Sequence, residues 1–289
     1  MSGRCDLRRQ QGMTLLGMLI AAALASLVFA LSLTALITVL QGARTVEHRM
    51  SRAQDARWVL RLLARDLSAH GRLGCKSLPW LPSDFSAGEW RLRLPGRELG
   101  VIRALRVGDS LEGMQLMKQA PETWRQWRRV WLGSCGSGRM LDGSGAQWRG
   151  DSDAPELRLT PALPLSPRED GVHLPSMQLW LPRERRYRLE AVGRGYRLLV
   201  RDWEGGLSDG EERLVLDGVK RMELRLLERQ GCGETARWSW RAPGSWPAGQ
   251  VPQAARLSLE WYPDDRETPV SQLELELALD AAPVCGAAR

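Results

Sequence analysis

The chain has few of the residues from which most enzyme and metal sites are built. Its 289 residues include three histidines, and its five cysteines form no close-spaced pair of the CxxC type. No HExxH segment, Walker A loop or dinucleotide-binding glycine fingerprint occurs. We interpret His48 and His70 as solvated residues of a predicted helix and His173 as a loop residue. We therefore expect no enzymatic activity, no metal and no cofactor.

Aromatic residues other than tryptophan are also scarce. Two Phe and three Tyr stand beside thirteen Trp, and we assign most of the tryptophan to a hydrophobic core. A hydrophobic content of 43% is ordinary for a chain with a packed core. The formal net charge of +7 permits contact with acidic lipids, nucleic acid or acidic proteins, but it does not choose among them.

Charged residues are absent from the run 13–40. The run exceeds the roughly 20 residues with which an α-helix crosses a bilayer, and it is too long for the apolar part of a signal peptide. Arg4, Arg8 and Arg9 precede it. Because cytoplasmic flanks carry the excess of positive charge, the N-terminus should stay in the cytoplasm. The sequence thus predicts a single-pass membrane protein whose main part is extracytoplasmic.

The border of this run has a particular form, in which the basic segment 8–12 ends in Gly12 and the apolar segment starts with Met13. It resembles the class III leader of type IV prepilins. The resemblance implies that a prepilin peptidase cleaves after Gly12, that Met13 is N-methylated, and that the head lies in the periplasm, anchored in the inner membrane. Two residues depart from the family: Met13 replaces the usual phenylalanine, and Gly17 replaces a glutamate. In pilins this glutamate pairs with a neighbouring subunit's N-terminal amine, so Gly17 hints at a tip or initiation position, where no subunit lies ahead.

Apolar residues continue beyond the membrane run with the spacing of three and four that is typical of an amphipathic helix. They are Met50, Ala53, Ala56, Leu60, Leu63 and Leu67. One helix from Met13 to about Ser68 would be roughly 85 Å long at about 1.5 Å per residue. We predict a leader over 1–12, a helical spine over 13–70 and a head over 71–289. The Gly- and Ser-rich stretch 133–145 is a candidate mobile loop, or a break between two subdomains.

The predicted head contains short runs of alternating apolar and polar residues, the pattern of half-buried strands. The runs cover 156–160, 177–181, 196–201, 222–227, 256–261 and 273–279. In the last run, Leu273 to Leu279 should alternate with the outward-facing Glu274 and Glu276. The expected fold is α+β and pilin-like, with a long N-terminal helix, transmembrane in its first half, packed on a mostly antiparallel β head.

Two segments resemble PilW-type minor pilins: Ala56 to Cys75, with its ARDL step and glycine–cysteine exit, and Glu212 to Leu224, which is similar to GspJ-like proteins as well. This resemblance implies a non-catalytic subunit that helps prime or cap type IV pilus assembly. Its partners would be other minor pilins, the major pilin, the prepilin peptidase and inner-membrane lipid. Segments 238–240, 246–247 and 257–259 loosely resemble the GspJ-like minor pseudopilins of type II secretion, which is the alternative reading.

Four cysteines remain if the leader, which carries Cys5, is removed. They are Cys75, Cys135, Cys232 and Cys285. An even number in an oxidising compartment suggests disulfides. Three pairings are possible, and neighbourhood in the sequence favours Cys75 with Cys135 and Cys232 with Cys285.

Arginine occurs in two basic clusters, 124–131 and 183–188. In the first, Trp127, Arg128 and Arg129 could contact a phosphate backbone and stack on bases, as a DNA-binding competence pilin would require. The alternative is a strand that turns its tryptophans inward and its arginines outward. We favour the strand, so nucleic acid is not among the expected partners.

Overall fold

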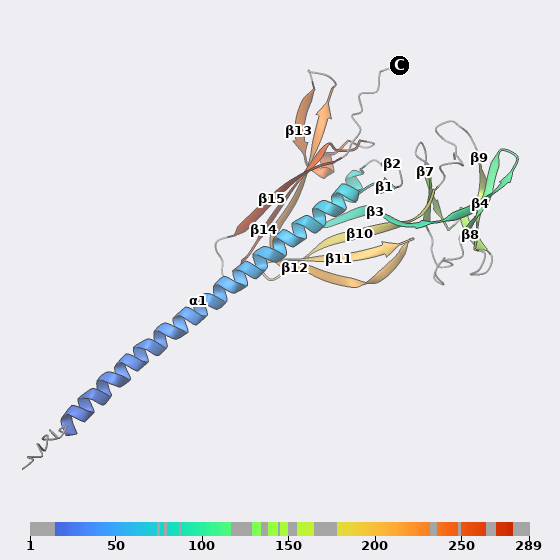
Figure 1. Cartoon of the computed structure of the whole chain (residues 1–289). Coiled ribbons are helices and arrows are strands. Elements are labelled where there is room, and N and C mark those ends of the chain that lie inside the picture. Colours follow the sequence, from blue (N-terminus) through green and yellow to red (C-terminus); the bar gives the residue numbers. More distant parts are fainter. Residues whose placement is uncertain are drawn as a thin grey trace, which may run out of the picture. The chain divides into compact units, whose positions relative to one another are not determined.

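The computed structural model of the chain describes residues 15–73, 76–77, 80–86, 88–116, 129–133, 138–143, 145–149, 155–164, 178–231, 236–247, 250–263 and 270–279. The chain divides into two compact units, residues 1–52 and residues 53–289. Helix α1 runs through the end of the first unit into the second, and the strands all belong to the second (Figure 1).

Helix α1 (Leu15–Ala69) is the long helix that the sequence predicts. In the first unit, its residues 15–44 are all exposed, and they include the whole described part of the uncharged run. Hydroxyl groups in this run donate to carbonyl oxygens of their own helix, at 2.8 Å from Ser26, 2.7 Å from Thr34 and 2.9 Å from Thr38. Hydroxyls bonded in this way are compatible with an apolar surrounding. Among the described residues, α1 is the one helix long and apolar enough to span a membrane.

The end of α1 is a glycine turn. Gly71 has a φ of +76°, a left-handed conformation that glycine adopts without a Cβ clash. Its N–H donates to the carbonyl of Arg93 at 2.8 Å, which fixes the end of the helix against strand β3 (Glu89–Leu99). Gly71 thus ends the helix close to the predicted border of the spine at residue 70.

The main sheet of the second unit has nine strands, mostly antiparallel pairs, in the order β15-β14-β12-β11-β10-β6-β7, with β13 beside β12 and β3 beside β10. The strands are β6 (Arg129–Gly133), β7 (Gly138–Asp142), β10 (Gln178–Val192), β11 (Gly195–Glu204), β12 (Leu207–Gln230), β13 (Arg237–Arg241), β14 (Ala254–Trp261) and β15 (Ser271–Ala278).

The described part of this unit also has two smaller sheets. A four-stranded sheet has the order β4-β5-β9-β8, and a two-stranded sheet pairs β1 with β2. These strands are β1 (Arg72–Leu73), β2 (Lys76–Ser77), β4 (Val101–Val107), β5 (Ser110–Leu116), β8 (Ala146–Arg149) and β9 (Glu156–Pro164). All six alternating runs of the sequence overlap strands, and stretch 133–145 contains β7.

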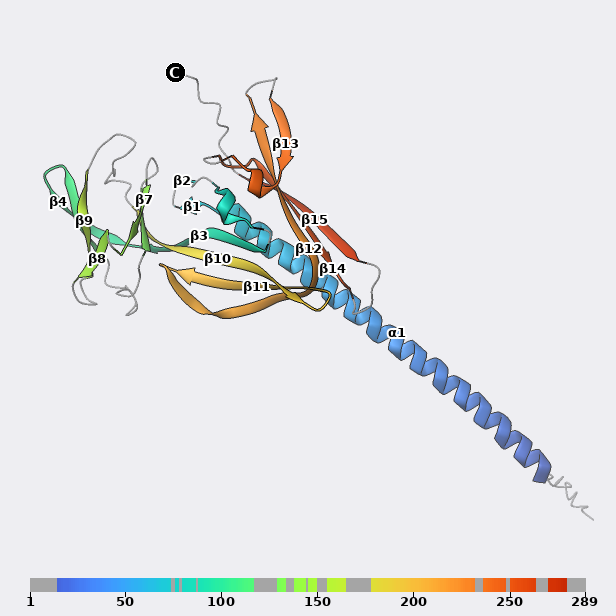
Figure 2. The same cartoon turned by 180° about the vertical axis from the view of Figure 1, so that it is seen from behind.

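The last third of α1 packs on the main sheet. Its apolar stripe of Ala56, Val59, Leu60, Leu63 and Leu67 is buried in one core cluster with sheet residues such as Leu92, Leu198, Leu224 and Leu257. Figures 1 and 2 both show strands β10, β11 and β12 running beside this part of the helix. A second core cluster takes most of its buried residues from β5, β6, β9 and the first part of β10.

The alternation predicted for the last strand is confirmed. In β15, Leu273, Leu275 and Leu277 are half-buried, while Glu274 and Glu276 are exposed. Together, the long apolar helix and the mostly antiparallel sheet confirm the α+β class.

Candidate functional site

Strand β10 changes its neighbour about a third of the way along one edge. Residues 183–192 pair with β11, whereas residues 178–180 pair with β6. Pro182 lies between these segments, where its missing N–H costs no ladder hydrogen bond. The turn after β11 links the two neighbours, since the Gly205 N–H donates to the Pro182 carbonyl and the Arg129 N–H donates to the Gly205 carbonyl, both at 2.9 Å.

The opposite edge of β10 has a bulge at the same level. The register with β3 shifts between Leu181 and Arg183, so that Pro95 and Gly96 together face Pro182. A Cβ on Gly96 would lie 1.6 Å from the carbonyl oxygen of Leu181, so only glycine fits there. The change of neighbour and the bulge together open the sheet locally.

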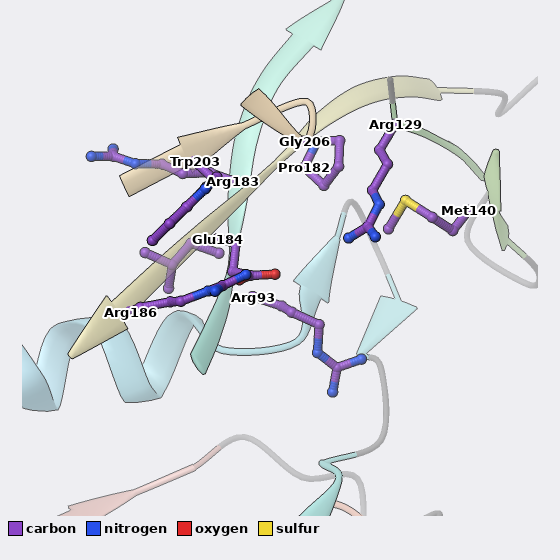
Figure 3. Close-up of a pocket in the computed structure, with 10 residues that line it drawn as sticks. Arg93, Arg129, Met140, Pro182, Arg183, Glu184, Arg186, Trp203 and Gly206 are labelled. Carbon is purple, nitrogen blue, oxygen red and sulfur yellow. The ribbon is translucent and has the colours of Figure 1, made fainter. Parts of the chain in front are cut away.

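A pocket of about 320 Å³ lies at this point of the sheet (Figure 3). Arg93 and Leu94 of β3, Arg129 of β6 and Met140 of β7 line it together with Pro182, Arg183, Glu184 and Arg186 of β10, Trp203 of β11 and Gly206. Figure 3 shows Arg129 and Met140 on one side of the pocket, Arg183, Glu184, Arg186 and Trp203 on the other, and Pro182 and Gly206 between them, next to Arg129. Four lining residues are arginines and one is acidic.

Three of these arginines are held by carboxylates. Arg93 Nη2 lies 2.7 Å from Asp84 Oδ2, and Arg183 Nη2 lies 2.7 Å from Asp202 Oδ2. Arg186 is paired with Glu184, and its guanidinium carbon lies 4.2 Å from the centre of the Trp203 ring. These contacts fix the positions of the charges along the pocket wall.

Arg129 differs from the other three. Its side chain is exposed, and no carboxylate among the described residues pairs with it. Its backbone N–H is bonded to Gly205, so the strand is fixed while the guanidinium extends to solvent.

A buried ionic network lies next to the pocket. Arg185 donates to Asp202 through Nε at 2.6 Å and Nη2 at 2.9 Å, and through Nη1 to Asp66 of α1 at 2.7 Å. Tyr187 donates its hydroxyl to Asp66 at 2.6 Å. Burial disfavours the charge of Arg185, so its guanidinium group is stable there only because Asp66 and Asp202 are close.

The network sets the protonation of its members. Burial by itself raises the pKa of Asp202, but the hydrogen bonds from Arg185 and Arg183 outweigh it and lower the pKa below the ordinary value. The hydrogen bonds to Asp202 raise the pKa of Arg185 despite its burial. Burial and the charge of Asp66 raise the pKa of Tyr187. Asp202 is thus a carboxylate, Arg185 a cation and Tyr187 a neutral phenol at neutral pH.

His70 is the residue that follows α1, and it contacts the backbone of the pocket residue Arg93. Its side chain is fully buried, with Trp80 and Phe85 ring centres 4.7 and 5.6 Å away. Nδ1 accepts the Arg93 N–H at 2.9 Å, so a neutral ring carries its proton on Nε2, which lies 3.4 Å from Asp84 Oδ2. Burial lowers the pKa of His70, and the charge of Arg93 lowers it further. The hydrogen bond to Asp84 raises the pKa but does not outweigh these two effects. The prediction that His70 is solvated is therefore wrong, because the chain after the helix folds back and covers it, whereas His48 is exposed as predicted.

The other sequence-based candidates have mixed outcomes. Gly12, Met13, Trp127, Arg128, His173 and the four head cysteines Cys75, Cys135, Cys232 and Cys285 lie outside the described residues. Gly17 is exposed on α1. In β6, Arg129 is exposed and Trp131 is buried, as the strand interpretation predicts. In the described part of the chain, no cluster of His, Cys, Asp or Glu could hold a metal ion.

Sequence reasoning missed two features near the pocket. The first is Arg185, whose signal was its place on the same strand face as Leu179, Leu181 and Tyr187, all buried. The second is the GxSxG spacing of residues 206–210, which marks a nucleophile on a strand-to-helix turn in hydrolases. Here the spacing falls at the start of β12, which forms a hairpin with β11 and continues as a strand to Gln230.

No protein-family model, curated protein or solved structure matches the chain. What the fold defines is an α+β protein with one N-terminal helix long and apolar enough to span a membrane, followed by a mostly antiparallel β head that carries an arginine-lined pocket.

Proposed function

We propose that the chain is a non-catalytic minor pilin of the PilW type that helps prime or cap type IV pilus assembly. The observation that carries this proposal is the change of environment along one continuous helix. Residues 15–44 of α1 are exposed and mostly apolar, whereas Ala56, Leu63 and Leu67 are buried in the core of the head. A helix of this kind suits a subunit that is held in a membrane by one part and carries a folded head on the other.

The leader-like sequence supports the same proposal. The basic segment that ends in Gly12 precedes an uncharged run, and Met13 is then the first residue of the mature chain. In this proposal the protein is held in the inner membrane, the head faces the periplasm, and the protein can enter the pilus tip. A prepilin peptidase processes it, and its partners are inner-membrane lipid, other minor pilins and the major pilin.

Its mechanism is association rather than chemistry. Apolar helices in a membrane associate by close packing, and small residues such as Gly17 allow neighbouring backbones to approach. Gly17 also spares the complex an unpaired carboxylate in the membrane, which would be costly. The heads would then meet through sheet edges and loops.

The decisive test is co-expression of the chain with its prepilin peptidase, followed by intact mass and N-terminal peptide analysis. We expect a mature chain that begins with N-methylated Met13. Gly12→Val should leave the leader in place, whereas the matched control Gly3→Val should not affect cleavage. An intact leader on the unmodified chain, or cleavage far downstream, would withdraw the pilin assignment and leave a membrane-anchored β-rich protein.

A minor pseudopilin of type II secretion is the second candidate. The tryptophan pair of the GspJ-like segment lies on β13, with Trp238 exposed and Trp240 half-buried, and Leu257 lies in β14 as a strand residue. Deletion of the gene separates the two. Loss of surface pili with normal secretion supports the minor pilin, and normal piliation with lost secretion supports the pseudopilin.

A further inference from the structure

We propose that the arginine-lined pocket at the strand exchange of β10 binds a small ligand that carries a phosphate group. The inference concerns the head alone and does not depend on the proposed function, the leader or the membrane run. It rests on the charge balance, the fixed arginines and the apolar part of the pocket wall.

The charge balance around the pocket is positive. The cationic groups are Arg65, Arg93, Arg129, Arg183, Arg185, Arg186 and Arg213, and the carboxylates that face them are Asp66, Asp84, Asp202 and Glu184. Asp202 is shared by three of these arginines, with Arg213 Nη2 at 3.3 Å. Glu89 lies 4.0 Å from Arg186, but it is paired with Arg91 at 2.8 Å. Seven cations against four carboxylates leave an excess of three positive charges in this cluster. This excess favours a multiply charged anion such as a phosphate monoester, which carries about −1.5 to −2 near neutral pH.

The arginines are arranged for binding before a ligand arrives. Arg93, Arg183 and Arg186 are held by Asp84, Asp202 and Glu184, so little side-chain entropy is lost on binding. Arg129, which has no carboxylate partner in the described part of the chain, supplies a full guanidinium group. Arg93 of β3, Arg129 of β6 and Arg186 of β10 line the pocket from three different strands, and guanidinium groups arranged in this way can donate to several oxygens of one tetrahedral anion. A planar carboxylate has two acceptor oxygens and would use fewer of them.

The rest of the pocket wall is apolar. Leu94, Met140 and Pro182 line it together with the Trp203 ring. A volume of about 320 Å³ is at the lower end of the range for small-molecule sites, too small for more than a phosphate and a compact organic group. Free inorganic phosphate and a phosphate ester share the recognised chemistry, and the contribution of the apolar wall distinguishes them.

The test measures binding by titration calorimetry to the full chain in a non-ionic detergent at low salt. The probes are inorganic phosphate, phenyl phosphate and, as the planar anion of similar size, benzoate. We expect both phosphates to bind and benzoate to bind at least about tenfold more weakly. Arg129→Ala should weaken phosphate binding by at least about tenfold, because a charge-assisted hydrogen bond is lost. Arg106→Ala, which removes an exposed arginine from β4, should leave binding unchanged.

Met140→Ala distinguishes the two sources of phosphate. If Met140→Ala binds phenyl phosphate more weakly than the unmodified chain but binds inorganic phosphate equally well, the ligand is a phosphate ester. If Met140→Ala binds both phosphates as well as the unmodified chain does, and only Arg129→Ala binds them more weakly, the ligand is free phosphate. No phosphate binding by the unmodified chain, equal binding of benzoate and phenyl phosphate, or equal losses in Arg129→Ala and Arg106→Ala would each overturn the proposal. Arg129 is exposed, so its replacement should not unfold the head, and a far-UV circular dichroism spectrum checks this directly.

Discussion

Asp66 of α1 and Arg185 of β10 are 119 residues apart in the chain, and their side chains meet at 2.7 Å inside the head. Asp66 is 3% exposed and Arg185 is 8% exposed. The same arginine binds Asp202 of β11 with two further hydrogen bonds. One buried cation thus connects the helix to two neighbouring strands of the sheet.

Replacing Asp66 tests this connection. Asp66→Ala leaves Arg185 with a single carboxylate and Tyr187 without its acceptor, so we expect the free energy of unfolding to fall by about 3–5 kcal/mol. Asp55→Ala removes an exposed carboxylate from the same helix and should change it by less than about 0.5 kcal/mol. Urea unfolding of the full chain in non-ionic detergent, followed by tryptophan fluorescence, gives both values. Equal unfolding midpoints for the two variants would show that the Asp66–Arg185 pair does not stabilise the packing of α1 on the sheet.

The burial of His70 predicts a pH dependence. Its pKa in the folded chain lies below the ordinary value of 6.5, so between these two values the unfolded chain binds more protons than the folded one. The free energy of unfolding therefore has its full value, as far as His70 is concerned, above pH 6.5, and it decreases as the pH falls below 6.5. Asp84 and Asp202, whose pKa values are also lowered, add a loss that begins only below about their ordinary value of 3.8.

A comparison of two histidine variants isolates this effect. We expect His70→Gln to lose less stability than the unmodified chain when the pH falls from 7.5 to 5. His48→Gln, on the exposed part of α1, should follow the unmodified chain. Urea unfolding series at several pH values measure the slopes, and a His70→Gln slope that equals that of the unmodified chain would contradict the prediction.

The sequence could predict the elements because their signals are local. The spacing of Ala56, Leu63 and Leu67 fixes the buried face of α1, and alternation in 273–279 fixes the two faces of β15. Each signal depends on a few neighbouring residues, and packing on the sheet agrees with it.

The pocket could not be predicted in the same way. It depends on where β10 exchanges β11 for β6, and this register is set by contacts between distant segments. Arg129 was singled out from a tryptophan- and arginine-rich cluster, but its grouping with Arg93 and Arg183 requires the sheet order. His70 was misjudged for a related reason, because helical spacing says nothing of the aromatic residues Trp80 and Phe85 that close over it.

The bulge beside the pocket depends on Gly96. In Gly96→Ala the new Cβ would collide with the Leu181 carbonyl, so β3 and β10 must separate, and we expect a loss of about 1–3 kcal/mol. Gly88→Ala is the matched control, since no atom lies within 4 Å of a Cβ at that position. Urea unfolding compares the two variants. A Gly96→Ala chain as stable as Gly88→Ala would mean that the sheet tolerates a wider opening at this level.

The two faces of α1 in the head should respond differently to truncation. Leu63 is fully buried in the core, whereas Trp58 is 56% exposed. Leu63→Ala removes apolar surface and leaves a cavity, so it should lower the free energy of unfolding by about 2–5 kcal/mol. Trp58→Ala removes a larger side chain but should cost less than about 1 kcal/mol, because most of that side chain is already in water. Urea unfolding followed by far-UV circular dichroism avoids the change in fluorescence that the lost tryptophan causes. If Trp58→Ala costs as much as Leu63→Ala, the exposed face of α1 is covered in the detergent-solubilised protein. An assembly larger than a monomer in sedimentation would then show that a second copy of the chain covers this face.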